Sequence, residues 1–261
     1  MSFRITCVLS LLVVGLGSNV ESADWRQLQG SALRTGNFEQ IKIPAKPTLV
    51  GAVPLTDAVL ASPVVAKGRV FAIDSSGVVF AIDAETLNVV WKFRTQGGAG
   101  NCNNVASPAV IGRYVHVATM AGHYYVLDVE SGEVINQIDC GEPVFAAPAI
   151  GNDRVYFATL GAQVYALQPN GEVIWKWDFV KEVVGFDGDR WKGEDWVAFR
   201  GDRVTWRDHF VCSREICLID RTVVMPAGGP RREPLEVDHP GERLVGAARG
   251  DLPRADLGLA T

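Results

Sequence analysis

Short apolar runs alternate with polar positions through much of the chain, and turn residues separate the runs. Branched and aromatic side chains recur at every second position within each run, which is typical of half-buried β-strands. The clearest runs are 69–73, 114–118 and 154–158. A glycine-containing turn follows each, at Gly77, Gly122 and Gly161. The pattern therefore predicts β-strands joined by tight turns.

Two further strands are expected after each of these turns. The first of them covers 78–82, 123–127 and 162–167. The second begins at 89–91, 134–136 and 173–175. Each unit is opened by a short, related sequence, at 61–65, 106–110 and 146–150, so the unit starts lie 45 and 40 residues apart.

Units of about 40 residues built from short strands are typical of the blades of a β-propeller. One such sheet cannot bury both of its faces, so neighbouring units must pack on one another. The expected fold class is all-β, with four-stranded antiparallel blades in an incomplete or small propeller of about four to five blades. An ordinary β-sandwich is the alternative.

The repeat divides the chain into expected segments. A degraded fourth unit is indicated by strand-like runs at 215–219, 222–225 and 235–237. The segments are a signal peptide at 1–22, an N-terminal segment with a ring-closing strand at 23–60, repeats at 61–246 and a poorly ordered tail at 247–261. Within the repeats, blades are expected near 61–105, 106–145, 146–180 and 210–246, with an insertion at 181–209.

Residues 81–91 resemble the tryptophan-docking motif of the pyrroloquinoline-quinone (PQQ)-like β-propeller repeats, Ala-x-Asp-x-x-Thr-Gly-x-x-x-Trp. Leu87 stands where that family prefers glycine, and Asn136 takes the tryptophan position of the second unit. The motif residues across the three units are Asp83, Thr86, Trp91, Asp128, Gly132, Gly171 and Trp175. In physical terms, the Asp and Thr side chains bond the turn backbone, glycine permits a positive φ, and the indole fills the gap between blades.

The resemblance implies a secreted bacterial member of that family that is truncated relative to its longer relatives. Residues 24–30 and 34–37 also resemble the opening of secreted members. Complete rings in the family are similar to seven or eight blades, or about 280 to 320 residues at about 40 per blade. An intact ring of four or five blades is the competing interpretation.

Charge and the N-terminus indicate compartment and partners. The 261 residues carry a net charge of −5, which disfavours nucleic acid as a partner. A basic start, a short apolar run and small residues before Ala23 match a secretory signal peptide, although a retained membrane anchor is the alternative. We expect a periplasmic or secreted protein with no transmembrane segment in the mature chain.

The segment 181–209 interrupts the repeat and holds the candidate site residues. Its tryptophans form a possible binding loop, since loops on rigid scaffolds often carry binding. Its carboxylates are weak candidates for a metal, because hard oxygen ligands suit calcium but the spacing does not match an EF-hand loop. These residues are Trp191, Trp196 and Trp206 for the loop, and Asp187, Asp189, Glu194 and Asp195 for the metal.

Cysteine pairing is the other chemical question. Cys212 and Cys217 would face each other across a two-residue turn at 214–215, within the distance that a disulfide tolerates. Free thiols, or a zinc site that includes His209, are the alternatives. Cys102 and Cys140 can also bridge, because four cysteines allow three connectivities.

No sequence motif for a nucleophile, a catalytic metal or a phosphate loop is present. We therefore expect a non-catalytic repeat protein that serves as a binding or assembly scaffold, without a cofactor, for other proteins of the cell envelope; a small-molecule ligand is possible. The alternative is a fragment or relative of a PQQ-dependent alcohol or sugar dehydrogenase, which would bind PQQ with calcium. Against it, the vicinal cysteines that the resemblance implies for such enzymes are missing.

Overall fold

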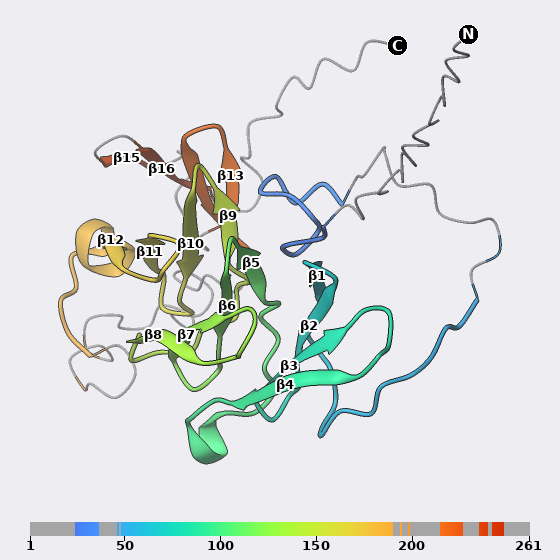
Figure 1. Cartoon of the computed structure of the whole chain (residues 1–261). Coiled ribbons are helices and arrows are strands. Elements are labelled where there is room, and N and C mark those ends of the chain that lie inside the picture. The colour runs from blue at the N-terminus through green and yellow to red at the C-terminus, as the bar shows by residue number, and fades with distance from the viewer. Residues whose placement is uncertain are drawn as a thin grey trace, which may run out of the picture.

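The computed structural model describes residues 24–36, 46, 48–189, 194, 198, 215–226, 235–239 and 242–247. These residues form sixteen strands in four four-stranded sheets, with a 3-10 turn, η1 (Gly98–Gly100), and a short π-helix, η2 (Val180–Val184) (Figure 1). The predicted all-β fold is therefore confirmed. The predicted signal peptide and residues 248–261 lie outside the described residues.

The first three sheets share one plan, in which each strand pairs antiparallel with the next along the chain. Each sheet also has a register shift between its third and fourth strands, at Ala81/Ile82, Val126/Leu127 and Ala166/Leu167. The first sheet contains β1 (Val64–Ala66), β2 (Arg69–Ile73), β3 (Val78–Asp83) and β4 (Val89–Arg94). The second contains β5 (Ala109–Ile111), β6 (Tyr114–Ala118), β7 (His123–Asp128) and β8 (Val134–Asp139). The third contains β9 (Ala149–Gly151), β10 (Arg154–Ala158), β11 (Gln163–Leu167) and β12 (Val173–Asp178).

The fourth sheet departs from this plan. It contains β13 (Cys217–Ile219), β14 (Thr222–Pro226), β15 (Leu235–His239) and β16 (Glu242–Ala247), in the order β13-β14-β16-β15. Strand β16 lies between β14 and β15 and runs parallel to β14. The expectation of wholly antiparallel blades therefore does not hold for this sheet. This order places Leu244 of β16 in the core against the third sheet, where it is 1% exposed.

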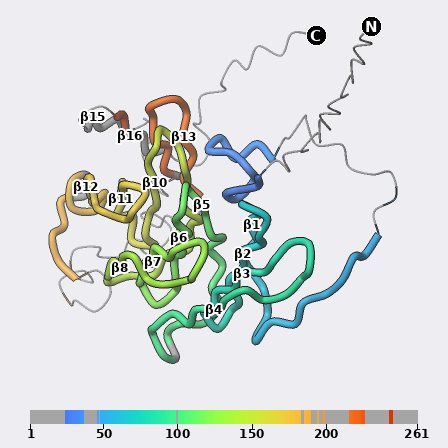
Figure 2. The backbone as a smooth tube through the Cα atoms, in the orientation of Figure 1, coloured from blue at the N-terminus to red at the C-terminus, as the bar shows by residue number. Residues whose placement is uncertain are grey.

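The sheets are arranged as successive blades of an arc. The first strand of each sheet is the innermost one, and β1 contacts β5, β5 contacts β9 and β9 contacts β13. The fourth strands β4, β8 and β12 lie at the outer edge, where most of their side chains are exposed. Figure 1 and the tube in Figure 2 show the sheets following one another around this inner line of strands. The expected incomplete propeller is confirmed.

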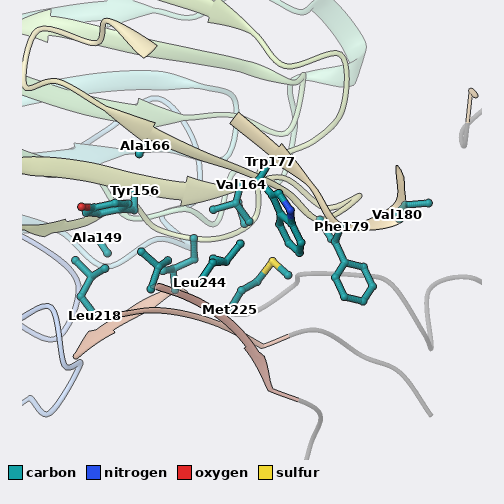
Figure 3. Close-up of a cluster of buried hydrophobic side chains, with 14 residues drawn as sticks. Ala149, Tyr156, Val164, Ala166, Trp177, Phe179, Val180, Leu218, Met225 and Leu244 are labelled. Carbon is teal, nitrogen blue, oxygen red and sulfur yellow. The ribbon is translucent and has the colours of Figure 1, made fainter. Parts of the chain in front are cut away.

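Hydrophobic clusters fill the gaps between neighbouring sheets. Phe71 and Trp91 meet Val115 and Leu127 between the first two sheets. Between the second and third, the rings of Tyr124 and Phe157 stack with centroids 4.0 Å apart. Figure 3 shows the gap between the third and fourth sheets, which is filled by Tyr156, Val164 and Trp177 from one side and Leu218, Met225 and Leu244 from the other.

The face of the first sheet that points away from the second sheet is covered by the segment that precedes β1. Val78, Phe80 and Ile82 pack there against Val53 and Leu55. Residues 48–60 contain no strand, so the ring-closing strand predicted within 23–60 is absent from this described part. The reason is that this part covers the sheet with side chains and adds only an isolated backbone bond, from the amide of residue 75 to the carbonyl of residue 58.

Candidate functional site

The turn between β3 and β4 is held by one carboxylate. Asp83 accepts hydrogen bonds from the backbone amide of Thr86 at 2.7 Å, from its hydroxyl at 2.9 Å and from the amide of Glu85 at 3.1 Å. These bonds, the Thr86 amide first, lower the pKa of Asp83. Leu87 adopts a φ of +60° in this turn, a conformation that glycine adopts more readily. The turn therefore keeps its form although a leucine replaces the glycine.

Trp91 connects the first sheet to the second. Its indole Nε1 donates to the carbonyl oxygen of Val129 at 2.9 Å. The ring lies against Gly132, because a β-carbon at that position would come within 2.7 Å of it. Arg69 reinforces the junction by donating to the Val129 carbonyl and pairing with Glu130. The turn of the second sheet is thus the surface on which the first sheet docks.

The corresponding turn of the second sheet has an additional cation. Asp128 accepts from the amides of Glu130 and Ser131 at 2.9 and 3.1 Å. It also accepts from Arg113 Nη2 at 2.6 Å, and this bond is the main cause that lowers the pKa of Asp128. The ion pair joins the turn to the neighbouring β5–β6 turn.

The junction between the second and third sheets has a smaller side chain at the equivalent position. Asn136 occupies the position of Trp91, and Gly171 of the third sheet lies against it. A β-carbon at Gly171 would lie 3.1 Å from the Asn136 β-carbon and 2.6 Å from Val126 Cγ2. The same turn glycine therefore makes the contact, although the side chain it meets is smaller.

The third and fourth sheets meet at a buried carboxylate that the sequence analysis did not identify. Glu242, whose side chain is 5% exposed, accepts from Trp175 Nε1 at 3.0 Å. The guanidinium of Arg154 and the hydroxyl of Tyr156 also donate to it. Burial is the main cause that raises the pKa of Tyr156, so that phenol stays protonated. Since Glu242 lies 67 residues after Trp175, no local pattern links the two.

A second feature missed by sequence reasoning is residues 24–36, which we call the clasp. The clasp lies beside the innermost strands of the arc (Figure 1). Trp25, Arg26 and Ala32 each accept, through a backbone carbonyl, a hydrogen bond from an innermost strand, and Gln27 bonds another through its side chain. The clasp therefore contacts all four sheets. The only signal in the sequence was the resemblance of 24–30 and 34–37 to secreted relatives.

The outer edge of the arc carries a repeated apolar feature. Each outermost strand of the first three sheets begins with two exposed β-branched residues, which we call the rim pairs. Their exposed fractions lie between 37% and 49%. The rim pairs are Val89–Val90, Val134–Ile135 and Val173–Ile174. Because edge strands offer unpaired backbone groups, such apolar edges favour the addition of a partner strand.

His116 and Cys140 are buried titratable groups of the arc with strongly shifted pKa values. His116 is fully buried and bonds the hydroxyl of Tyr124 through Nδ1 and the carbonyl of Pro169 through Nε2. Burial lowers its pKa to about 4, so the ring is neutral near pH 7. Burial raises the pKa of the Cys140 thiol to about 12. Neither group is prepared for proton transfer or nucleophilic attack near neutral pH.

His123 is less completely bonded. Its Nδ1 is buried and has no hydrogen-bond partner within the described part, and it lies 3.9 Å from Asp139 Oδ1.

Cys102 is exposed, Cys140 is buried and Cys217 is partly buried, and all three have free thiols. The suggested Cys102–Cys140 bridge is therefore wrong: one thiol points to solvent and the other into the core between two sheets.

The candidate residues of 181–209 are only partly described. Asp187 pairs with Lys181 at 2.8 Å, and Asp189 lies exposed nearby in sequence. Among the residues that the structure describes, no group of three His, Cys, Asp or Glu side chains is placed to hold a metal. Glu194 is helical and exposed, whereas the remaining candidates lie outside the described residues: Asp195, Cys212, Trp191, Trp196 and Trp206. Cys217 has a free thiol, so the structure does not show the Cys212–Cys217 disulfide, which remains a prediction together with the metal site and the binding loop.

Residues 51–144 match the PQQ-type repeat family model described as outer membrane protein assembly factor BamB. The matched segment therefore resembles PQQ-like β-propeller repeats. No curated protein matches the sequence. The described residues contain no helix long and apolar enough to span a membrane.

One solved structure shows the same fold. Quinohemoprotein alcohol dehydrogenase ADHIIG from Pseudomonas putida HK5 is 18% identical with a TM-score of 0.55, over 76% of this chain and 33% of that one. BamB from Moraxella catarrhalis is 20% identical with a TM-score of 0.42, over 48% of this chain and 42% of that one. The match thus spans less than half the length of either protein. At 18% identity, the comparison with the Pseudomonas putida enzyme shows the fold alone.

Proposed function

We propose that this PQQ-like repeat protein is a non-catalytic scaffold that binds other proteins of the cell envelope, in the periplasm or after secretion. The observation that carries the proposal is the match of residues 51–144 to a family described as an assembly factor. The geometry supports it, since indole, guanidinium and carboxylate contacts hold the sheets together at their junctions. A rigid arc can present the same surface to successive partners.

The rim pairs are the surface that we assign to partner binding. They recur at the same position of three successive outer strands, so they form a line along the outer edge of the arc. A partner that contributes an extended strand would pair with the edge backbone and cover the branched side chains. The expected partner is therefore an envelope protein that presents an exposed apolar strand.

Site-specific crosslinking in cells tests the scaffold function. A photoreactive residue at position 137, exposed on β8 beside a rim pair, should capture a defined envelope protein. Val90→Lys with Ile135→Lys should abolish the crosslink, because two buried charges would oppose strand addition. Lys92→Ala with Gln137→Ala changes exposed positions on the same strands and is the matched control, probed from position 94. Equal crosslinking by both variants would rule out the rim.

The dehydrogenase alternative is tested by cofactor binding. It is favoured by the fold shared with the Pseudomonas putida enzyme. Purified protein should be titrated with PQQ and calcium while the quinone absorbance and dye-linked oxidation of alcohols and sugars are measured. A stoichiometric quinone band with calcium-dependent dye reduction would replace the scaffold function. No quinone binding would exclude the dehydrogenase.

A further inference from the structure

The innermost strands of the four sheets expose one backbone amide each at equivalent positions. Each strand has three residues, and in each the N–H of the middle residue points away from the neighbouring strand of its own sheet. The four middle residues are Val65, Val110, Ile150 and Leu218. Because these strands are edges, the amides need partners from elsewhere.

The clasp bonds all four of these amides. Val65 donates to the carbonyl of Trp25 at 2.9 Å, and Val110 donates to that of Arg26 at 2.8 Å. Leu218 donates to the carbonyl of Ala32 at 3.0 Å. The thirteen residues of the clasp thus provide a hydrogen-bond acceptor for the middle amide of one edge strand in each sheet. The first two bonds use backbone carbonyls, so they require an extended backbone but no particular side chain.

Two side chains of the clasp add specificity. Gln27 bonds Ile150 twice, accepting its N–H at 2.9 Å and donating to its carbonyl at 3.2 Å. Arg34 donates to the carbonyls of Ala147 and Pro148 at 3.0 Å each and to that of Ile216 at 3.3 Å. Those carbonyls immediately precede β9 and β13, so one guanidinium joins the starts of the third and fourth sheets.

We propose that the inner edges of the four sheets form a peptide-binding site, which the chain's own clasp fills. Its ligand class is a peptide that supplies two successive backbone carbonyls and then a glutamine, and that turns back through hydrogen-bonded turns to place an arginine seven residues beyond the glutamine. This site is independent of the rim pairs, so it stands whether or not the rim binds a partner. A partner that presents this pattern competes with the clasp.

Hydrogen exchange in the full chain is the first test. If the clasp releases as a unit, the four middle amides exchange at a common rate. Arg34→Ala should then accelerate all four by about tenfold or more, since hydrogen bonds to a charged group are lost, with β3 and β7 amides unchanged. Acceleration at Leu218 alone, or no acceleration, would overturn the proposal. Arg26→Ala is the control, because that side chain is 60% exposed while its carbonyl remains.

Peptide exchange is the second test. A protease site inserted between Leu49 and Val50, which are 87% and 85% exposed, allows the folded chain to be cut without losing residues. A labelled peptide of residues 24–36 should then replace the native segment, one per chain, as followed by anisotropy. The peptide with Arg34→Ala should bind about tenfold more weakly or worse, and that with Arg26→Ala equally well. Equal binding of both peptides, or no exchange in urea that leaves the sheets folded, would contradict the proposal.

Discussion

The indole of Trp91 lies so close to Gly132 that a β-carbon at position 132 would come within 2.7 Å of two ring atoms. Gly132 therefore meets two requirements at once. Its φ of +73° is a conformation that side chains disfavour, and its missing side chain makes room for the tryptophan of the preceding sheet. Both the turn and the sheet junction therefore depend on the absence of a β-carbon at position 132.

Gly132→Ala should lower the free energy of unfolding by more than the strain of a positive φ alone. We expect a loss of about 3 kcal/mol, since overlap with the indole adds to the backbone cost. The measurement is urea denaturation. Gly112→Ala in the same sheet is the matched control: its φ is +57° and nothing lies within 4 Å of the added atom, so it should lose only about 1 kcal/mol. Similar losses for both would show that the Trp91 contact contributes nothing.

Glu242→Ala should destabilise the arc by about 3 kcal/mol, because it removes the shared acceptor of the buried Tyr156 phenol and of the partly buried Arg154 guanidinium and Trp175 indole N–H. Glu130→Ala removes the partner of Arg69 at a site where the carboxylate is 66% exposed. We expect that control to lose less than about 1 kcal/mol. Denaturation of both variants at one pH checks the difference, and a small effect at Glu242 would contradict the role of this junction.

Acid should destabilise the protein through His116. Its pKa is about 4 in the fold against 6.5 in the unfolded chain, so the unfolded state binds a proton first as the pH falls. The contribution of His116 to the free energy of unfolding is therefore fully present above pH 6.5. It is lost as the pH falls towards 4, and the total loss is about 3 kcal/mol. Urea denaturation across this range should show the decline, and His116→Gln should flatten it. The lowered pKa values of Asp83 and Asp128 act below their ordinary value of 3.8, outside this window.

Thiol labelling should separate the cysteines by environment. With iodoacetamide at pH 8, exposed Cys102 should react in the native protein, whereas buried Cys140 should react only after unfolding, because the reactive thiolate is suppressed there. If the predicted disulfide forms, Cys212 and Cys217 stay unlabelled until a reductant is added. Peptide mass mapping reads all sites in one experiment. Rapid native labelling of Cys140 would show that its sheet junction opens.

The regular part of the fold was readable from local pattern. Strands such as 69–73 and 154–158 alternate in the sequence because one face of each sheet meets a neighbour, and they end where predicted. The sequence pattern predicted only three strands of the fourth sheet and missed β16. The position of β16 between β14 and β15 depends on the packing of Leu244 against the third sheet. Pattern within a strand predicts pairing with the next strand in sequence, but not insertion between two others.

The sequence by itself determined the repeat, the three regular sheets and the motif turns, because hydrogen bonding and side-chain alternation within about 40 residues produce them. Only the tertiary structure decided which residues join the sheets. Trp175 meets Glu242, and Arg34 meets the carbonyls of Ala147 and Ile216, through bonds that span 67 to 182 residues. Such contacts leave no periodic trace in the chain, since they arise where the curvature of the packed sheets brings distant backbone together.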